Sequence, residues 1–79
     1  MKKVEIYTTP TCQYCKMAKE FFKANNVEYT EYNVMADADK RQQMIEKSGQ
    51  MGVPVIFVDD DMVIGFDKEK LASLLGISA

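Results

Sequence analysis

The sequence predicts an α/β fold for one domain that spans residues 1–79. Two segments of alternating polarity near the N-terminus flank an amphipathic helix, and a helical crossover of this kind joins parallel strands in a right-handed unit. The most continuously apolar run, residues 55–58, is followed by a short acidic turn and a second apolar segment, which indicates an antiparallel hairpin. With the remaining helices, the predicted order of elements is β-α-β-α-β-β-α.

The N-terminal part of the chain predicts a strand, a helix and a second strand. Residues 4–7 alternate apolar and charged side chains before a break that contains Thr and Pro, so they predict the first strand. The helix is expected from about Cys12 to Asn25, with Thr11 as its N-cap. Residues 27–33 alternate again and predict the second strand. The helical spacing should bury Cys15, Ala18, Phe21 and Phe22 and expose Lys16, Lys19, Glu20 and Lys23.

The middle of the chain predicts a second helix that ends at Ser48. Asp37 or Asp39 can cap its start, because a carboxylate accepts hydrogen bonds from the free N–H groups of the first turn. Gly49 suits the left-handed residue that commonly follows a helix. The inward-facing residues should be Met44 and Ile45.

The C-terminal part predicts a hairpin and a last helix. Residues 55–58 should form a strand that is buried on both faces, because every one of them is apolar. The three aspartates at 59–61 should form the turn, and residues 62–64 should form the antiparallel partner strand. Asp67 can cap the final helix, which should end at Gly76.

The composition argues against several classes of function. A formal charge of −2, from 12 acidic and 10 basic residues, gives no basic stripe of the kind that nucleic acid requires. No apolar run approaches the length of a membrane span, and residues 1–7 are too short and too polar for a signal peptide. We therefore expect a cytoplasmic protein that binds neither nucleic acid nor a membrane.

The two cysteines, Cys12 and Cys15, lie three residues apart at the start of the predicted first helix. Residues at this spacing are neighbours on one helix face, so a small local shift can join them in an easily reduced disulfide. The free N–H groups and positive dipole end of a helix start favour a thiolate at Cys12, which should be the nucleophile. Cys15, one turn further in, should resolve the mixed disulfide that forms on Cys12.

Two other interpretations of the cysteine pair are open. A structural disulfide would close a very short loop and would therefore constrain the unfolded chain very little. A zinc or iron-sulfur site has only two soft ligands in one copy, since the chain has no His, and would need a second chain or an added thiol. In a reducing compartment, a lone pair of close cysteines is more often catalytic than structural.

Three motifs, taken in the order in which they occur along the chain, resemble those of a known family. They are the segment Val4-Glu5-Ile6-Tyr7-Thr8 before C-Q-Y-C-K, then Val53-Pro54 before the apolar strand, and then Gly65-Phe66-Asp67 before the last helix. Together with the order of elements, they closely resemble the glutaredoxin branch of the thioredoxin superfamily. The resemblance implies a thioredoxin-like fold, with a four-stranded mixed sheet flanked by three helices.

The resemblance also implies an activity and its partners. A glutaredoxin-type thiol-disulfide oxidoreductase would use Cys12 and Cys15 to reduce protein disulfides and glutathione mixed disulfides, as a monomer. Glutathione would be its co-substrate, and no cofactor or metal would be bound. The implied glutathione or substrate contacts are Thr11, Tyr14, Val53, Pro54, Gly65, Phe66 and Asp67. Of these, Pro54 would be in the cis isomer, which leaves the backbone of Val53 free to pair with an extended substrate.

Differences from the family pattern leave the electron donor open. Gln13 stands where glutaredoxins commonly have proline, as in small glutaredoxin-like hydrogen donors that are reduced by thioredoxin reductase and serve, for example, ribonucleotide reductase. Thr9 stands where many members have a lysine for the glycine carboxylate of glutathione, a contact that Arg41, Lys16 or Gln50 could replace. A third alternative, from another class, is an iron-sulfur or metal carrier bridged across a dimer.

Overall fold

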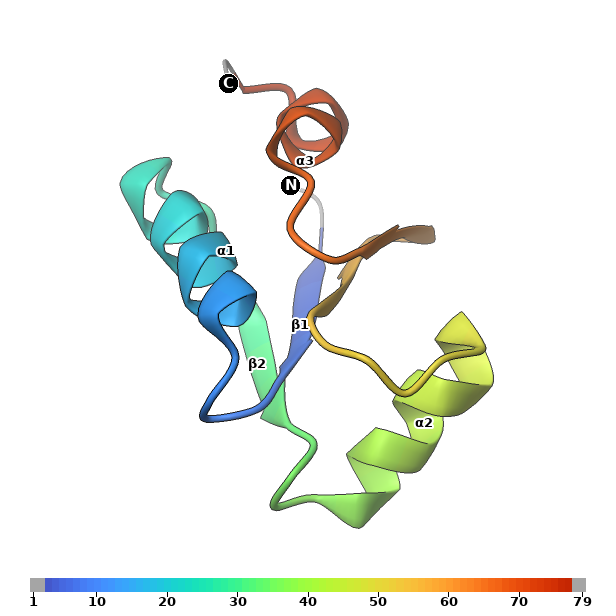
Figure 1. Cartoon of the computed structure of the whole chain (residues 1–79). Coiled ribbons are helices and arrows are strands. Elements are labelled where there is room, and N and C mark those ends of the chain that lie inside the picture. Colours follow the sequence, from blue (N-terminus) through green and yellow to red (C-terminus); the bar gives the residue numbers. More distant parts are fainter. Residues whose placement is uncertain (1–2, 78–79) are drawn as a thin grey trace.

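The computed structural model describes residues 3–77, and its elements follow the order that the sequence predicts (Figure 1). The ends of the predicted domain, residues 1–2 and 78–79, lie outside the described part. The elements are β1 (Val4–Thr8), α1 (Gln13–Ala24), β2 (Thr30–Asn33), α2 (Ala38–Ser48), β3 (Val55–Val58), β4 (Asp61–Ile64) and α3 (Lys68–Leu75).

The strands form one mixed sheet in the order β2-β1-β3-β4. β1 pairs with β2 in parallel, whereas β3 is antiparallel to both of its neighbours. Helices α1 and α3 lie on one side of the sheet and α2 lies on the other (Figure 1). The expected four-stranded mixed sheet with three flanking helices is therefore confirmed.

The core has two parts, one on each face of the sheet, because neighbouring residues of a strand point to opposite faces. On the face covered by α1 and α3, the buried side chains are Val4, Ile6, Ala18, Phe21, Phe22, Ile56, Val58, Val63, Leu71 and Ala72. On the face covered by α2, they are Tyr7, Val34, Met44 and Val55. The predicted burial of β3 is thus confirmed for Val55 on one face and for Ile56 and Val58 on the other, whereas Phe57 is half-buried.

The second strand begins later than predicted, at Thr30 and not at residue 27. The chain turns sharply after α1, where Asn26 has a left-handed φ of 57°, and the Val27 N–H donates to the Phe22 carbonyl at 2.8 Å. The Val27 backbone therefore closes the end of α1 instead of joining the sheet. Tyr29 packs its ring 5.3 Å from that of Phe22, so the alternation in the sequence reflects packing against the helix.

The ends of α2 agree with the prediction. Asp37 caps the helix, with Oδ1 accepting from the Lys40 N–H at 3.1 Å, while Asp39 lies in the first turn. Gly49 ends the helix in the left-handed conformation, at a φ of 72°. A side chain at that φ would be strained, so glycine fits this position for a backbone reason.

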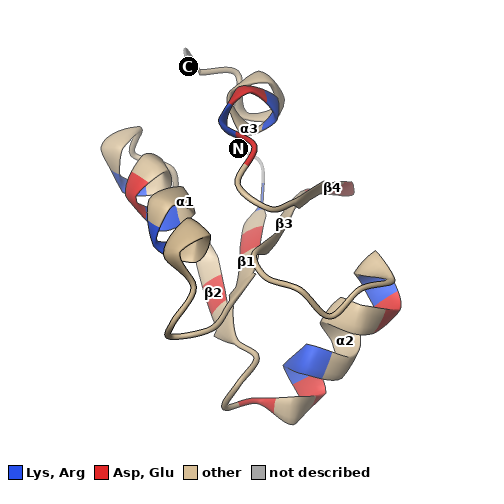
Figure 2. Cartoon of the chain, viewed as in Figure 1, with Lys and Arg blue, Asp and Glu red and all other residues tan. Residues whose placement is uncertain are grey.

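Charged side chains of both signs lie on each of the three helices (Figure 2). This mixture agrees with the formal charge of −2, and no helix carries residues of one sign alone. Among residues 3–77, no helix has the length and apolar character needed to span a membrane.

Met44→Ala is expected to lower the free energy of unfolding by about 2–5 kcal/mol, because the change leaves a cavity at a buried site. Within α2, all of which is described, Met44 is the one buried residue, with none of its surface exposed. Urea denaturation of both proteins measures the loss. The matched control is Met35→Ala, at a side chain that is 66% exposed, which should change stability by less than about 0.5 kcal/mol. Equal losses would contradict the assignment of Met44 as the anchor of α2.

Candidate active site

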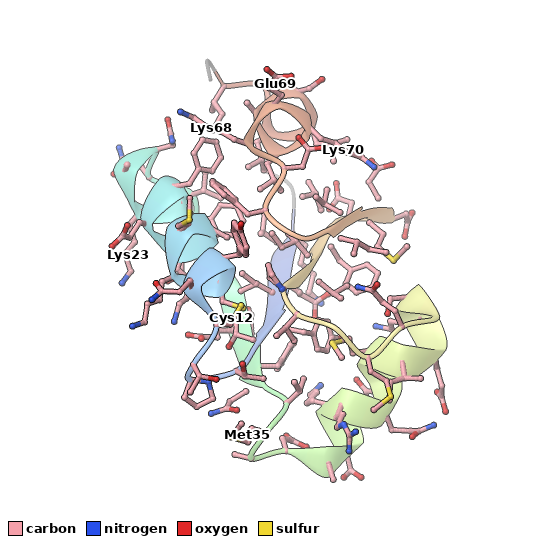
Figure 3. The ribbon with its side chains drawn as sticks, viewed as in Figure 1. Cys12, Lys23, Met35, Lys68, Glu69 and Lys70 are labelled. Atoms are coloured by element: carbon pink, nitrogen blue, oxygen red, sulfur yellow. The ribbon has the colours of Figure 1, made fainter. Side chains whose placement is uncertain are left out.

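The start of α1 is shaped by Cys12, which is the N-cap of the helix. Its extended backbone, with φ −83° and ψ 113°, turns the sulfur over the first turn, where Sγ accepts a hydrogen bond from the Cys15 N–H at 3.1 Å. The prediction that Thr11 caps this helix is therefore wrong. Thr11 is exposed and lies one residue before the cap. Figure 3 shows Cys12 at the start of α1.

The two cysteines are free thiols in different surroundings. Cys12 is half-buried, whereas Cys15 is 1% exposed. Burial, together with the hydrogen bond and charge of Cys12, raises the pKa of the Cys15 thiol from 9.0 to about 12. The Thr9 backbone and the Lys19 ammonium oppose it. Cys15 is consequently held as a neutral thiol while Cys12 remains in contact with solvent.

The segment Val53-Pro54 lies beside the end of β1, because the antiparallel register pairs Val55 with Tyr7. The Val53-Pro54 peptide bond is cis, as the family resemblance implies. Pro54 is buried, and its carbonyl accepts a hydrogen bond from the Gly65 N–H at 2.8 Å. The sheet thus brings the proline segment and the Gly65 turn together near the residues that precede Cys12.

Within residues 3–77, the backbone of Val53 takes part in none of the hydrogen bonds. Val53 is half-buried, and the strand that follows it begins only at Val55. Unpaired backbone groups next to a strand are available to an extended chain that adds to the sheet.

The remaining predicted contacts have separate structural roles. Phe66 is half-buried, and its ring packs 6.0 Å from that of Phe21 on α1. Asp67 is the N-cap of α3, with Oδ1 accepting from the Lys70 N–H at 3.1 Å. Tyr14 is 61% exposed on the first turn of α1. Helix capping and core packing therefore explain Asp67 and Phe66 in part, whereas no packing explains Tyr14.

A pocket of about 330 Å³ lies beside Thr9. Its lining residues are Thr9, Val34, Met35, Ala38, Arg41 and Met51. Of the three side chains that the sequence offered in place of a lysine at position 9, Arg41 is the one that lines this pocket. The pocket is therefore apolar apart from one cation and one hydroxyl, and it adjoins the loop that leads into Cys12.

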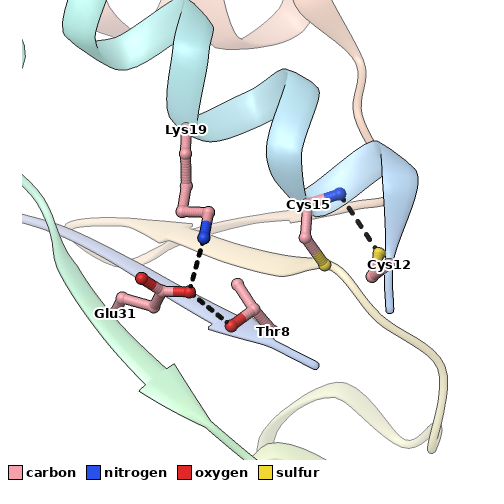
Figure 4. Close-up of polar contacts among 5 residues, drawn as sticks. All are labelled: Thr8, Cys12, Cys15, Lys19 and Glu31. Carbon is pink, nitrogen blue, oxygen red and sulfur yellow. Dashed lines mark hydrogen bonds and ion pairs between the residues drawn. The ribbon is translucent and has the colours of Figure 1, made fainter. Parts of the chain in front are cut away.

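A polar cluster formed by Thr8, Lys19 and Glu31 joins three elements next to Cys15 (Figure 4). Thr8 Oγ1 on β1 donates to Glu31 Oε2 on β2 at 2.7 Å. Lys19 Nζ on α1 donates to the same oxygen at 2.9 Å. The prediction that Lys19 faces solvent is wrong, because its side chain is only 26% exposed and turns toward β2.

The charge state of this cluster follows from its hydrogen bonds. The bond to Glu31 raises the pKa of Lys19 above 10.5. Burial acts to raise the pKa of Glu31, but the hydrogen bonds from Thr8 and Lys19 outweigh it and hold that pKa below 4.5. The cluster is therefore an ion pair at neutral pH. A partly exposed pair of this kind stabilises a fold by about 1 kcal/mol at most.

Among residues 3–77, no three His, Cys, Asp or Glu side chains lie close enough together to hold a metal ion. A metal or cluster on the cysteine pair would need ligands from outside this set of residues.

Comparisons with known proteins agree with this geometry. The family model described as Glutaredoxin matches residues 4–63. A glutaredoxin-like 8.6 kDa protein in the rubredoxin operon of Clostridium pasteurianum is 40% identical, over 91% of this chain and 96% of the relative. Glutaredoxin 3 of Escherichia coli K12 is 42% identical, over 85% of this chain and 81% of the relative. The crystal structure of a glutaredoxin from Archaeoglobus fulgidus has a TM-score of 0.83 and 29% identity, over 95% of this chain and 87% of that one.

The match extends over both halves of the sheet and includes the cysteine pair and the proline segment. A family match of this extent, on a fold that places a half-buried and a fully buried thiol at one helix start, assigns the type of chemistry as well as the architecture. The chain belongs to the glutaredoxin family and is a glutaredoxin-type thiol redox protein with a thioredoxin fold.

Proposed function

We propose that this protein reduces protein disulfides and glutathione mixed disulfides, with Cys12 as the nucleophile and Cys15 as the resolving thiol. The observation that carries this assignment is the difference in burial between the two sulfurs. Cys12 is half-buried and its Sγ accepts a backbone N–H bond, whereas Cys15 is 1% exposed. A substrate disulfide can therefore reach Cys12 and not Cys15.

The reaction then has two exchange steps. The Cys12 thiolate attacks one sulfur of the substrate disulfide, forms a mixed disulfide and releases the other sulfur as a thiolate, which takes up a proton. Cys15 loses its proton and attacks Cys12 Sγ, so that the second substrate thiol leaves and the Cys12–Cys15 disulfide forms. Two electrons pass from the dithiol to the substrate. A thiol reductant such as glutathione, which is itself oxidised to a disulfide, restores the dithiol.

The groove for the substrate would run past the proline segment. The free backbone groups of Val53, beside buried Pro54, suit the main chain of an extended thiol substrate. Exposed Tyr14 and Thr11 flank Cys12 and would line the other side.

Glutathione has a charged group at each end, and the chain offers a complement for both. The Gly65-Phe66-Asp67 turn supplies the Asp67 carboxylate and the N–H groups at the start of α3 for the γ-glutamyl end. At the other end, Arg41 in the pocket beside Thr9 would receive the glycine carboxylate. These contacts support glutathione as the co-substrate, with no bound cofactor.

The second candidate has the same chemistry with thioredoxin reductase as the donor. Gln13 and Thr9 favour it, since both differ from the common glutaredoxin pattern. A carrier of an iron-sulfur cluster across a dimer is a weaker candidate, because the described residues supply only two soft ligands at this place. A cytoplasmic, monomeric protein is part of the proposal, because a reducing compartment keeps the dithiol ready to react.

A coupled assay separates the two donors. The wild-type protein is expected to reduce a small glutathione mixed disulfide when glutathione and glutathione reductase are supplied, and to reduce it more slowly with thioredoxin reductase alone. Consumption of nicotinamide cofactor measures both rates.

Cys15→Ser should keep activity on the small substrate, because a second glutathione can resolve the intermediate, but should lose reduction of a protein disulfide. Turnover with thioredoxin reductase only would overturn glutathione dependence, and activity in Cys12→Ser would overturn the assigned roles.

Arg41→Gln is expected to raise the apparent KM for glutathione about tenfold with little change in kcat. A charge-assisted contact contributes about 1.5–3 kcal/mol, exposure reduces this, and about 1.4 kcal/mol is one decade. The contact is far from the reacting sulfur, so the loss should appear in KM. Adding Thr9→Lys to the Arg41→Gln protein should restore much of the affinity for glutathione.

The matched control for Arg41 is the neighbouring cation Lys40, whose Nζ lies 4.3 Å from the centre of the Tyr32 ring. Lys40→Gln should leave KM for glutathione unchanged. Equal effects of the two substitutions would indicate a general loss of positive charge and would contradict a specific carboxylate contact at Arg41.

A further inference from the structure

The Thr8, Lys19 and Glu31 cluster lies where it can act on the second exchange step. Lys19 follows Cys15 by four residues on α1, so their side chains leave the same face of the helix and point toward the sheet (Figure 4). Thr8 is 2% exposed and ends β1, directly before Thr9, whose backbone faces the Cys15 sulfur. The cluster therefore lies on the sheet side of the buried thiol, with Thr8 buried and the ion pair of Lys19 with Glu31 partly exposed.

We propose that Lys19 and Glu31 are positioning residues for the resolving step. The ammonium of Lys19 stabilises the Cys15 thiolate, and the charge of Glu31 sets the strength of that stabilisation. This rests on the proposed function, in which Cys15 attacks Cys12 Sγ. A buried thiolate is costly unless a nearby positive charge compensates it.

The order of the two steps changes the charges around Cys15. In the free dithiol, burial raises the pKa of Cys15 most, the hydrogen bond and charge of Cys12 raise it further, and Lys19 acts to lower it. Once Cys12 is joined to a substrate sulfur, it no longer carries a negative charge. The electrostatic opposition from Cys12 is then gone, while the attraction from Lys19 remains. Loss of the Cys15 proton therefore becomes easier after the first attack has occurred.

Glu31 has two effects on Lys19. Its Oε2 accepts from Lys19 Nζ at 2.9 Å and so fixes the ammonium between α1 and β2. Its negative charge also cancels part of the field that Lys19 exerts on Cys15. Thr8 donates to the same oxygen at 2.7 Å and so holds the carboxylate in place. Replacing Glu31 by Gln keeps an acceptor oxygen at this position and removes the negative charge alone.

Other titratable groups among residues 3–77 also act on this ion pair. Tyr29, from the segment before β2, acts on Lys19, and Lys23, one helical turn further along α1, acts on Glu31. Residues 49–58, which include the proline segment and β3, contain no charged or titratable side chain. Lys19, four residues further along α1, lowers the pKa of Cys15.

The test follows both exchange steps with a nitrobenzoate disulfide reagent, which releases one coloured thiolate when Cys12 attacks and a second when Cys15 resolves. Stopped-flow absorbance between about pH 6 and pH 10 gives a pH profile for each release. Lys19→Gln should slow the second release about threefold at a given pH, which shifts its pH profile by about half a unit toward higher pH. Glu31→Gln should shift the same profile toward lower pH. The first release should not change in either variant.

Three controls separate this effect from a loss of structure. Lys19→Arg keeps the charge and should restore the wild-type profile. Lys23→Gln removes a cation one turn along the same helix and should leave the second release unchanged. Added salt should shrink the difference between Lys19→Gln and wild type, because the effect is electrostatic. Glu31→Gln also tests the proposal independently if Lys19→Gln does not fold.

Superimposable second-release profiles for wild type and Lys19→Gln would overturn the inference. Shifts in the same direction for Lys19→Gln and Glu31→Gln would also overturn it, since a structural defect, unlike a charge effect, has no reason to change sign. Failure of the proposed function gives a different result, because Cys15→Ser would then release the second thiolate as fast as wild type does.

Discussion

The hydrogen bond from the Cys15 N–H to Cys12 Sγ, at 3.1 Å, fixes the arrangement on which the chemistry depends. By making a sulfur the N-cap, it places one thiol at the positive end of α1, where backbone N–H groups lack helical partners. The other thiol then falls one turn inside, on the face that packs against the sheet. One helix start therefore holds two identical side chains in unequal surroundings, and this inequality separates the attacking role from the resolving role.

The rest of the fold maintains this inequality. Phe21 and Phe22 anchor α1 in the core shared with β1 and β3, and this keeps Cys15 buried. The antiparallel pairing of β1 with β3 brings the Val53-Pro54 segment beside the end of β1, and the bond from Gly65 to Pro54 attaches the start of the last helix to the same place. Segments far apart in the sequence thus meet around the one accessible sulfur, as expected of a site assembled at the end of a sheet.

Local patterns predicted much of this from the sequence. The spacing of Cys12 and Cys15, the cap at Asp37 and the apolar run of β3 each depend on residues close together in the chain. The cap of α1 was predicted at Thr11 because a hydroxyl is the commoner cap, and no propensity signals a sulfur acceptor. The ion pair of Lys19 with Glu31 joins residues 12 apart on different elements, so no helical or strand periodicity reveals it. The pocket around Arg41 likewise exists only after the fold has brought α2 near Thr9.

The central claim is that burial keeps Cys15 a neutral thiol in the free enzyme, so that Cys12 alone begins the reaction. The most direct measurement is the carbon-13 chemical shift of the Cys15 Cβ in reduced, cysteine-labelled wild-type protein, recorded from about pH 6 to pH 10. We expect the signal to keep its thiol value throughout this range, because the pKa of Cys15 is raised to about 12. A thiol-to-thiolate transition with a midpoint at or below 9.0, the ordinary value, would contradict the account.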